Sequence, residues 1–250
     1  MKKIVVIPAR LSSSRLPRKV LLDLKGKSVI QRVYEQVKKA KKIDAIYIAT
    51  DSLEVEAQCK SFTSNIILTS TKHESGTDRI AEAVKKIECD IVINVQGDEP
   101  FIEPSLIDEF ADIFEKEFLD MVSAMHKISL VDELKNSNIV KVIVNKNQEA
   151  IYFSRATIPY SRDSHDELFN QQLIPKNLTF YRHLGIYAYS KEFLLKYSQM
   201  DMTYLENLEK LEQLRVIENG YKIKMIETDY NSIGIDTQED YEKALEIINE

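Results

Sequence analysis

Residues 3–19 read KIVVIPARLSSSRLPRK, so that a short apolar run leads directly into a loop rich in cations and hydroxyls. The run Ile4–Ile7 has the length and composition of a buried strand. The cations of the loop are Arg10, Arg15, Arg18 and Lys19. Guanidinium and ammonium groups, hydroxyls and backbone N–H groups together suit a polyphosphate. We therefore expect phosphate binding here, and a merely solvated basic loop is the alternative.

Strands and helices alternate through the first half of the chain. Apolar runs at 3–7, 45–49, 65–68 and 90–95 predict strands, and apolar residues at helical spacing follow within 29–40, after Ser52 and within 80–87. Pro104 begins a further helix that extends to about Lys116. This alternation predicts an α/β fold with a doubly wound, mostly parallel sheet. Ligands of such sheets bind beyond the carboxyl ends of the strands.

The pattern changes after residue 120. Strand-like segments at 121–126, 139–145 and 150–153 have short connections and predict an antiparallel insertion, and 163–179 reads as a polar surface loop. Strands are expected at 180–189 and 221–226, a core-facing helical stripe at Leu205–Leu214, and a last helix at 237–248 capped by Thr237. We expect one domain over 1–250, with an insertion over about 120–190.

Glycine is scarce, with 6 residues in 250, and the two nearest in sequence are Gly220 and Gly234. A Walker A loop and a G-x-G-x-x-G fingerprint each need two glycines within about six residues, so both are excluded. Any triphosphate must be bound without a glycine-rich cradle. Gly26 and Gly220 read as ordinary turns.

The composition bounds the class of protein. A net charge of −6 disfavours a nucleic-acid-binding protein, and two isolated cysteines fit a reducing, cytoplasmic compartment. The first apolar run is too short for a signal peptide, and no stretch has the length of a membrane span, so no membrane insertion is expected.

Two aspartates follow apolar segments at expected ligand-facing positions. Asp98 lies in QGDEP, directly after the strand at 90–95, and Asp236 lies in GIDT, just before the last helix. Each has a simpler interpretation, a turn for QGDEP and a helix cap for Asp236. Carboxylates beside phosphates are typical Mg²⁺ ligands. Together with the basic loop they indicate metal-assisted phosphoryl or nucleotidyl transfer.

Four further groups are candidates for ligand contact. Thr50-Asp51 follows a strand, and SGTDR at 75–79 begins a helix, where N-terminal amides can receive a nucleotide. Arg155 and Arg162 flank Ile158-Pro159 and would hold a substrate carboxylate or be surface charge. The strand YRHLGIY contains His183, and a lone histidine is more often structural than catalytic.

Seven segments resemble one known family. In order they are PARLSSSRLPRK (8–19), SGTDRIAEA (75–83), INVQGDEPFI (93–102), YFSRATIPYSRD (152–163), YRHLGIYAY (181–189), LEKLEQLR (208–215) and GIDTQED (234–240). They resemble the 3-deoxy-manno-octulosonate cytidylyltransferases, or CMP-Kdo synthetases. The resemblance implies a nucleotide-diphospho-sugar transferase fold of the GT-A-like type, a homodimer built through the insertion, and Mg²⁺. It also implies that CTP and Kdo give CMP-Kdo and pyrophosphate, for lipopolysaccharide synthesis.

The resemblance also implies roles for individual residues. Catalysis would rest on Arg10, Lys19, Asp98 and Asp236, the two aspartates being the Mg²⁺ ligands. CTP would contact Pro8, Ala9, Arg10, Ser13, Arg15, Lys19, Thr50, Asp51, Ser75, Gly76, Thr77 and Arg79. The sugar would contact Gln96, Arg155, Arg162, His183, Tyr187, Glu212 and Gln213. The chain departs from the family at Arg18, where glycine is usual, and at Lys27-Ser28, where Lys-Pro is usual.

Two alternatives remain open from the sequence. The same chemistry could act on 8-amino-Kdo or another ulosonate, or the scaffold could be a catalytically silent nucleotide sensor. The presence of both Asp98 and Asp236 disfavours the silent protein.

Overall fold

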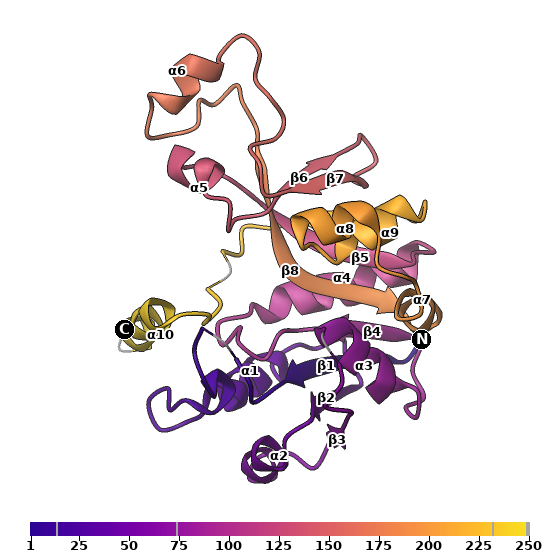
Figure 1. Ribbon diagram of the computed structural model, residues 1–250. Helices are drawn as coiled ribbons and strands as arrows, with labels where there is room; N and C mark the ends of the chain where they lie inside the picture. Colours follow the sequence, from indigo (N-terminus) through magenta and orange to yellow (C-terminus); the bar gives the residue numbers. More distant parts are fainter. Residues whose placement is uncertain (14, 74, 232, 249–250) are drawn as a thin grey trace. The chain divides into compact units, whose positions relative to one another are not determined.

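The computed structural model describes residues 1–13, 15–73, 75–231 and 233–248, and the chain divides into two compact units (Figure 1). Unit 1 contains Met1–Phe118, Ile186–Ser198 and Tyr230–Glu250, and unit 2 contains Leu119–Gly185 and Gln199–Asp229. The expected insertion over about 120–190 thus lies largely in unit 2, which also takes in residues 199–229.

Unit 1 is built on a mostly parallel sheet, as the sequence predicts. Strands β1 (Lys3–Ala9), β2 (Ala45–Thr50), β3 (Ile66–Leu68) and β4 (Ile91–Asn94) lie in the order β3-β2-β1-β4 and pair in parallel. The end of β8 (Tyr181–Ser190) pairs antiparallel with β4. The helices are η1 (Lys19–Leu21), α1 (Val29–Val37), α2 (Leu53–Cys59), α3 (Gly76–Val84), α4 (Pro104–Lys116), α7 (Lys191–Tyr197) and α10 (Gln238–Ile247). The sequence analysis missed α7.

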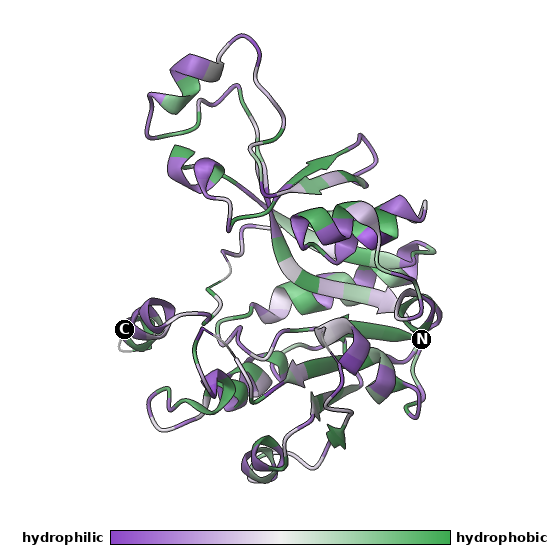
Figure 2. Cartoon of the chain, in the orientation of Figure 1, coloured by the Kyte–Doolittle hydropathy of each residue, from purple (hydrophilic) through white to green (hydrophobic). Residues whose placement is uncertain are grey.

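The strand interiors and helix starts follow from local sequence. All residues of β1 and β4 are buried, which fits the apolar runs at 4–7 and 91–93 within them (Figure 2). The side chains of Ser52, Ser75 and Thr237 each accept a hydrogen bond from a first-turn N–H, and Pro104 occupies the first turn of α4. Ser28, where the family usually has proline, caps α1 in the same way. These caps place polar loops after the parallel strands.

Unit 2 has strands from both halves of its sequence. Strands β5 (Met121–Lys127) and β9 (Ile223–Glu227) pair in parallel, whereas β6 (Lys141–Val144) pairs antiparallel with β7 (Ala150–Ser154) and with β8. Its helices are α5 (Val131–Lys135), α6 (His165–Phe169), α8 (Tyr204–Glu209) and α9 (Gln213–Glu218). The prediction of antiparallel pairing is confirmed for β6 and β7, whereas β5 pairs in parallel with β9, which arrives from later in the chain. Within the described part of the chain, no helix has both the length and the apolar character to cross a membrane.

Two other expectations for this unit are wrong. The segment 163–179 is more than a polar loop, because it contains α6 and contributes Leu168, 1% exposed, to a small core with Ile128, Val131, Leu134 and Phe180. The stripe at Leu205–Leu214 is two helices, separated at Lys210 by a left-handed backbone with φ of 54°. Leu208 is 65% exposed, so it does not face a core.

One close approach in unit 1 can be tested directly. A Cβ atom at Gly97 would lie 2.7 Å from the carbonyl oxygen of Pro8, so the backbone after β4 packs against the end of β1 only without a side chain. We expect Gly97→Ala to lower the free energy of unfolding by about 1–3 kcal/mol, as forced overpacking does. A thermal or urea melt measures the loss.

The matched control is Gly185→Ala. Among the described residues, nothing lies within 4 Å of a Cβ atom placed there, so this variant should be at least as stable as the wild type. Equal melting of the Gly97 and Gly185 variants would contradict the packing argument.

Candidate functional site

Three segments of unit 1 that are far apart in sequence meet at the carboxyl edge of its sheet. They are the loop after β1, the turn after β4 and the segment that enters α10. The first two are neighbours because β1 and β4 are adjacent parallel strands. The third is tied to the second by a hydrogen bond of 2.9 Å from the Ile235 N–H to the Asp98 carbonyl. This hydrogen bond places Asp236, the next residue after Ile235, close to Asp98.

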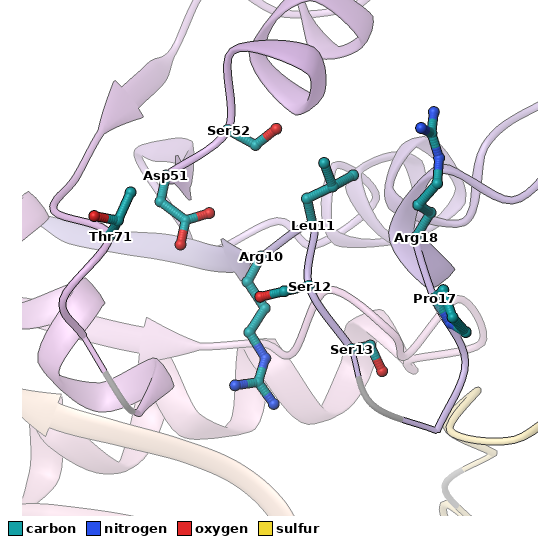
Figure 3. Close-up of a pocket in the computed structure, with 9 residues that line it drawn as sticks. All are labelled: Arg10, Leu11, Ser12, Ser13, Pro17, Arg18, Asp51, Ser52 and Thr71. Carbon is teal, nitrogen blue, oxygen red and sulfur yellow. The ribbon is translucent and has the colours of Figure 1, made fainter.

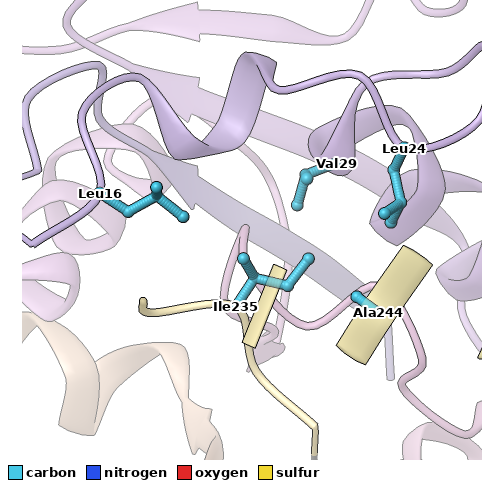
Figure 4. Close-up of a cluster of buried hydrophobic side chains, with 5 residues drawn as sticks. All are labelled: Leu16, Leu24, Val29, Ile235 and Ala244. Carbon is cyan, nitrogen blue, oxygen red and sulfur yellow. The ribbon is translucent and has the colours of Figure 1, made fainter. Parts of the chain in front are cut away.

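A cluster of buried apolar side chains includes residues from the loop after β1 and from the segment that enters α10 (Figure 4). Its members are Leu16, Leu24, Val29, Ile235 and Ala244, of which the most exposed is Leu16 at 7%. Leu16 lies next to Arg15 in sequence, and Ile235 lies next to Asp236. Burial of these apolar neighbours therefore fixes where the adjacent charged groups lie.

Lys19 lies between the two aspartates. Its ammonium group forms ion pairs with Asp98 and, at 2.8 Å, with Asp236, and Arg15 adds an ion pair of 3.0 Å to Asp236. The side chain of Lys19 is only 12% exposed, and that of Asp236 is 45% exposed. We call Lys19, Asp98, Asp236 and Arg15 the carboxylate cluster. It contains three of the four residues that the resemblance makes catalytic.

The charges in the cluster stabilise one another. Burial acts to lower the pKa of Lys19, but the charges and hydrogen bonds of Asp98 and Asp236 outweigh it and raise the pKa. Burial acts to raise the pKa of Asp236, but Lys19 and Arg15 outweigh it and lower the pKa. Lys19 and Asp236 are therefore both ionised around neutral pH.

The cluster fits a divalent cation by its donor chemistry. Two carboxylates that converge on one cationic group offer the hard oxygen donors that Mg²⁺ prefers, and the Lys19 ammonium is the cation that they share here. Among the described residues, no group of three or more acidic, histidine or cysteine side chains could hold a metal. A Mg²⁺ ion on Asp98 and Asp236 would therefore need oxygen donors from a substrate and water, as is usual for this ion.

A cavity of about 870 Å³ opens beside the loop that follows β1 (Figure 3). Its lining combines the basic loop with the ends of the neighbouring strands: Arg10, Leu11, Ser12, Ser13, Pro17, Arg18, Asp51, Ser52 and Thr71. Arg10, Ser13 and Asp51 were expected to bind the nucleotide. Ser14, in the same loop, lies outside the described residues. The volume is in the usual range for a small-molecule site.

The four cations of the loop have different surroundings. Arg15 and Lys19 belong to the carboxylate cluster, and Arg18 forms an ion pair with Glu54 of α2. Arg10 is exposed and has no ion pair or hydrogen bond with any residue that the structure describes. Arg10 therefore has the greatest freedom to bind an anionic ligand.

The backbone conformation at Arg18 explains why glycine is usual in the family at this position. Its backbone is left-handed, with φ of 59° and ψ of 22°, which glycine adopts freely and other residues adopt at a cost of about 1–2 kcal/mol. The loop therefore keeps the backbone that a glycine would give, while the chain places a cation there.

The remaining predicted CTP residues are not among those that line the cavity. Ala9 and Thr50 are buried ends of β1 and β2, and the Thr50 hydroxyl accepts a hydrogen bond from the Ser52 N–H. Pro8 lies beside Gly76, at 3.5 Å from a Cβ atom placed there, and Thr77 is buried. Ser75 is the N-cap of α3.

Arg79 is 2% exposed and has two internal partners. It forms an ion pair of 2.7 Å with Asp51 and a hydrogen bond of 2.7 Å to the Thr69 hydroxyl. Its guanidinium therefore holds Asp51 at the wall of the cavity, a role that the prediction of direct CTP contact did not include.

The predicted sugar residues are divided between the units. Gln96 and Tyr187 belong to unit 1, where the Gln96 amide nitrogen donates to Asn94 at 3.0 Å and Tyr187 stacks on Tyr189. The others belong to unit 2: Arg155, Arg162, His183, Glu212 and Gln213.

In unit 2 the structure brings His183 and Gln213 together. The Gln213 amide nitrogen lies 3.4 Å from His183 Nδ1, and His183 Nε2 lies 2.8 Å from the hydroxyl of Ser123. Burial lowers the pKa of His183 to about 3, so the ring is neutral. Nδ1 then accepts from Gln213 while Nε2–H donates to Ser123. The histidine thus orients the glutamine, consistent with the structural interpretation of a lone histidine.

Arg155 is held by Glu209. The Glu209 carboxylate accepts from the Arg155 N–H at 2.9 Å and from the Ser154 hydroxyl at 2.6 Å, while its carbonyl accepts from Arg155 Nε at 2.8 Å. Arg162 is exposed, and Glu212 is the residue that precedes α9. Arg155 is therefore anchored from its backbone and from its side chain.

Sequence reasoning missed several residues of the site. Ser52 and Thr71 follow strands β2 and β3, so the rule that ligands lie beyond strand ends would have found them. Ser123 and Glu209 carry no such signal, because one lies inside a strand and the other in a helix. Their roles depend on tertiary contacts alone.

Comparison with known proteins agrees with this geometry. The family model described as cytidylyltransferase matches residues 4–224. A 3-deoxy-manno-octulosonate cytidylyltransferase of Geotalea uraniireducens is 44% identical over 247 residues, which are 98% of each chain. One of Thermodesulfovibrio yellowstonii is 45% identical over 100% of this chain and 99% of its own.

Solved structures give the same result. The structure of CMP:2-keto-3-deoxy-manno-octonic acid synthetase complexed with CTP is 38% identical to this chain and has a TM-score of 0.91. The match covers 100% of this chain and 99% of that chain. The 4-diphosphocytidyl-2C-methyl-D-erythritol synthase of Anaerococcus prevotii shares the fold, with a TM-score of 0.61 at 16% identity over 100% of this chain and 97% of its own. The chain therefore belongs to the 3-deoxy-manno-octulosonate cytidylyltransferase family.

Proposed function

We propose that this enzyme transfers the cytidylyl group of CTP to 3-deoxy-manno-octulosonate (Kdo) and releases pyrophosphate. The observation that carries the proposal is that the basic loop after β1 both lines the cavity and, through Lys19, pairs with Asp98 and Asp236. The relatives of 44% and 45% identity have this activity in their names, and the neighbour of 38% identity binds CTP. CMP-Kdo made in this way supplies lipopolysaccharide synthesis.

The reaction joins two substrates without an enzyme-bound intermediate. The C2 hydroxyl oxygen of Kdo forms a bond to the α-phosphorus of CTP, and the hydroxyl proton is released to water. The bond from that phosphorus to the bridging oxygen breaks, and pyrophosphate leaves with the electron pair. Neither cysteine suits a nucleophile, because Cys59 and Cys89 are buried and burial raises the pKa of Cys59 to about 12. The enzyme therefore contributes by positioning and by charge.

The cations of the loop divide this work. Arg10, exposed at the cavity, would bind phosphate oxygens of CTP. Lys19 is fixed by Asp98 and Asp236, so its ammonium would lie beside the phosphates that approach those carboxylates. Two cations close to the leaving pyrophosphate would stabilise the negative charge that it gains.

We further propose that Asp98 and Asp236 hold Mg²⁺ when the nucleotide is bound. The ion would neutralise the triphosphate and acidify the sugar hydroxyl. The two carboxylates that already share one cation support this role. The absence of a nucleic-acid partner and a cytoplasmic location stay predictions.

We propose that Kdo is the sugar substrate. Within unit 2, the Gln213 amide that His183 orients and the anchored Arg155 are groups that could bind a hydroxyl and a carboxylate. These groups would suit any ulosonate, so 8-amino-Kdo remains the second candidate. The relatives' names favour Kdo.

A pyrophosphate-release assay tests the function. We expect release from CTP that requires both Kdo and Mg²⁺, with much less from UTP or ATP and less with 8-amino-Kdo. Asp98→Asn should lower turnover by about a hundredfold or more, because the ion loses a charged ligand. Circular dichroism checks that the variant is folded.

The control replaces a carboxylate outside the cluster. Glu239 is on α10, three residues after Asp236, and its side chain is 77% exposed. Glu239→Gln should turn over as the wild type does. Near-normal turnover by Asp98→Asn would overturn the metal assignment, and no release with any ulosonate would favour the silent nucleotide sensor.

We also propose a homodimer formed through unit 2. This unit leaves large apolar side chains uncovered: Leu130, Ile151, Tyr160, Leu173, Met202, Tyr204 and Leu208. Ile151 lies on β7, which among the described strands pairs with β6 alone, and Tyr204 and Leu208 lie one turn apart on α8. Exposed apolar side chains in such number favour a protein partner.

Sedimentation equilibrium measures the assembly. The wild type should have twice the chain mass of 28.9 kDa, and the double variant Ile151→Glu/Leu208→Glu should shift towards the single chain, since charges cannot be buried unpaired. The control Leu53→Glu/Leu68→Glu alters exposed leucines of unit 1 and should stay dimeric. A monomeric wild type would refute the proposal.

A further inference from the structure

Arg18 is a cation of the cavity with no part in the proposed reaction so far. It lines the cavity together with Arg10, Ser12 and Ser13. Its guanidinium and that of Arg10 point in opposite directions in Figure 3. Arg18 is the N-cap of η1, which begins with Lys19. It is therefore joined directly to the residue at the centre of the carboxylate cluster.

We propose that Arg18 is a second phosphate-binding arginine, which exchanges its ion pair with Glu54 for the β- and γ-phosphates of CTP. This inference rests on the proposed use of the cavity for the triphosphate. It adds a residue to which the resemblance gives no role, because glycine is the residue that the resemblance implies there.

The backbone of Arg18 is the first support. With φ of 59° it keeps the left-handed conformation that a glycine would adopt, so the loop has the same course with either residue. A bulky residue is strained in this conformation. Arg18 therefore adds a long cationic side chain at the wall of the cavity without changing the course of the loop.

The partner of Arg18 is the second support. Glu54 is in the first turn of α2, and the two side chains are 59% and 45% exposed. An ion pair as exposed as this contributes little to stability and is easily exchanged. A terminal pyrophosphoryl group carries more charge than one carboxylate, and it can accept two parallel N–H bonds from a guanidinium.

The other cations show why Arg18 is available for this exchange. Lys19 and Arg15 are held by carboxylates that would themselves bind the metal, and Lys19 is largely buried. Glu54 has no other ion pair among the described residues, and no other group here requires that it keep Arg18. The cavity would thus bind the triphosphate with Arg10 and Arg18 from two directions.

The test compares CTP binding by two single variants. A structural role and a phosphate-binding role of Arg18 predict different results for them. Arg18→Gly removes the cation and keeps the backbone, whereas Glu54→Gln releases the cation. If Arg18 binds phosphate, Arg18→Gly should weaken CTP binding by about five- to tenfold and Glu54→Gln should strengthen it two- to threefold. The double variant should resemble Arg18→Gly. Calorimetric titration with CTP, in the presence of Mg²⁺ and without sugar, gives each Kd.

Pyrophosphate is the second probe. Its inhibition of the wild type should be weakened in Arg18→Gly by a similar factor, while the Kd for CMP, which lacks the terminal phosphates, should be unchanged. Glu56→Gln, on the same helix but paired with Lys60, is the control and should leave all three ligands unaffected.

The outcomes separate the two levels of the proposal. If the wild type binds CTP but both variants weaken binding together, or neither changes it, the ion pair is structural and the role of Arg18 is wrong. If the wild type binds no CTP, the proposed function itself fails.

Discussion

The ammonium group of Lys19 forms ion pairs with two carboxylates, Asp98 and Asp236, that are separated by more than half of the chain. Asp98 and Asp236 could not approach each other closely without a cation between them, because like charges repel at short range. Two further interactions hold the same segments together. One is the backbone hydrogen bond from the Ile235 N–H to the Asp98 carbonyl, and the other is the buried apolar cluster around Leu16. The C-terminal segment is fixed to the sheet of unit 1 in this way, and the site exists because of it.

Much of this could be predicted from local sequence. Strands β1 and β4 are buried along their whole length and contain the apolar runs at 4–7 and 91–93, and Ser52, Ser75 and Thr237 mark helix starts. The parallel sheet follows from the alternation of these elements, and the carboxyl edge then gathers the loops that follow them. The positions of the basic loop and Asp98 were predictable for this reason, whereas Asp236 alone reads as a helix cap and became a candidate only together with them.

The parts that could not be predicted depend on contacts between distant residues. Unit 2 pairs β5 with β9, about a hundred residues later, and no local pattern specifies that partner. The stripe at Leu205–Leu214 has helical spacing, yet Lys210 divides it and Leu208 faces outward, while the charged Glu206 is buried against Arg215. Likewise, Arg79 has the sequence context of a ligand contact, but its burial makes it a support for Asp51. Periodicity alone does not distinguish these cases.

In the proposed reaction, the metal and the triphosphate meet at the carboxylate cluster. Electron paramagnetic resonance of Mn²⁺, used in place of Mg²⁺, measures this directly when CTP is titrated into the protein. The wild type should immobilise one Mn²⁺ per chain in the presence of CTP, and Asp236→Asn should weaken that binding at least tenfold. Equal Mn²⁺ affinity in wild type and variant would contradict the account.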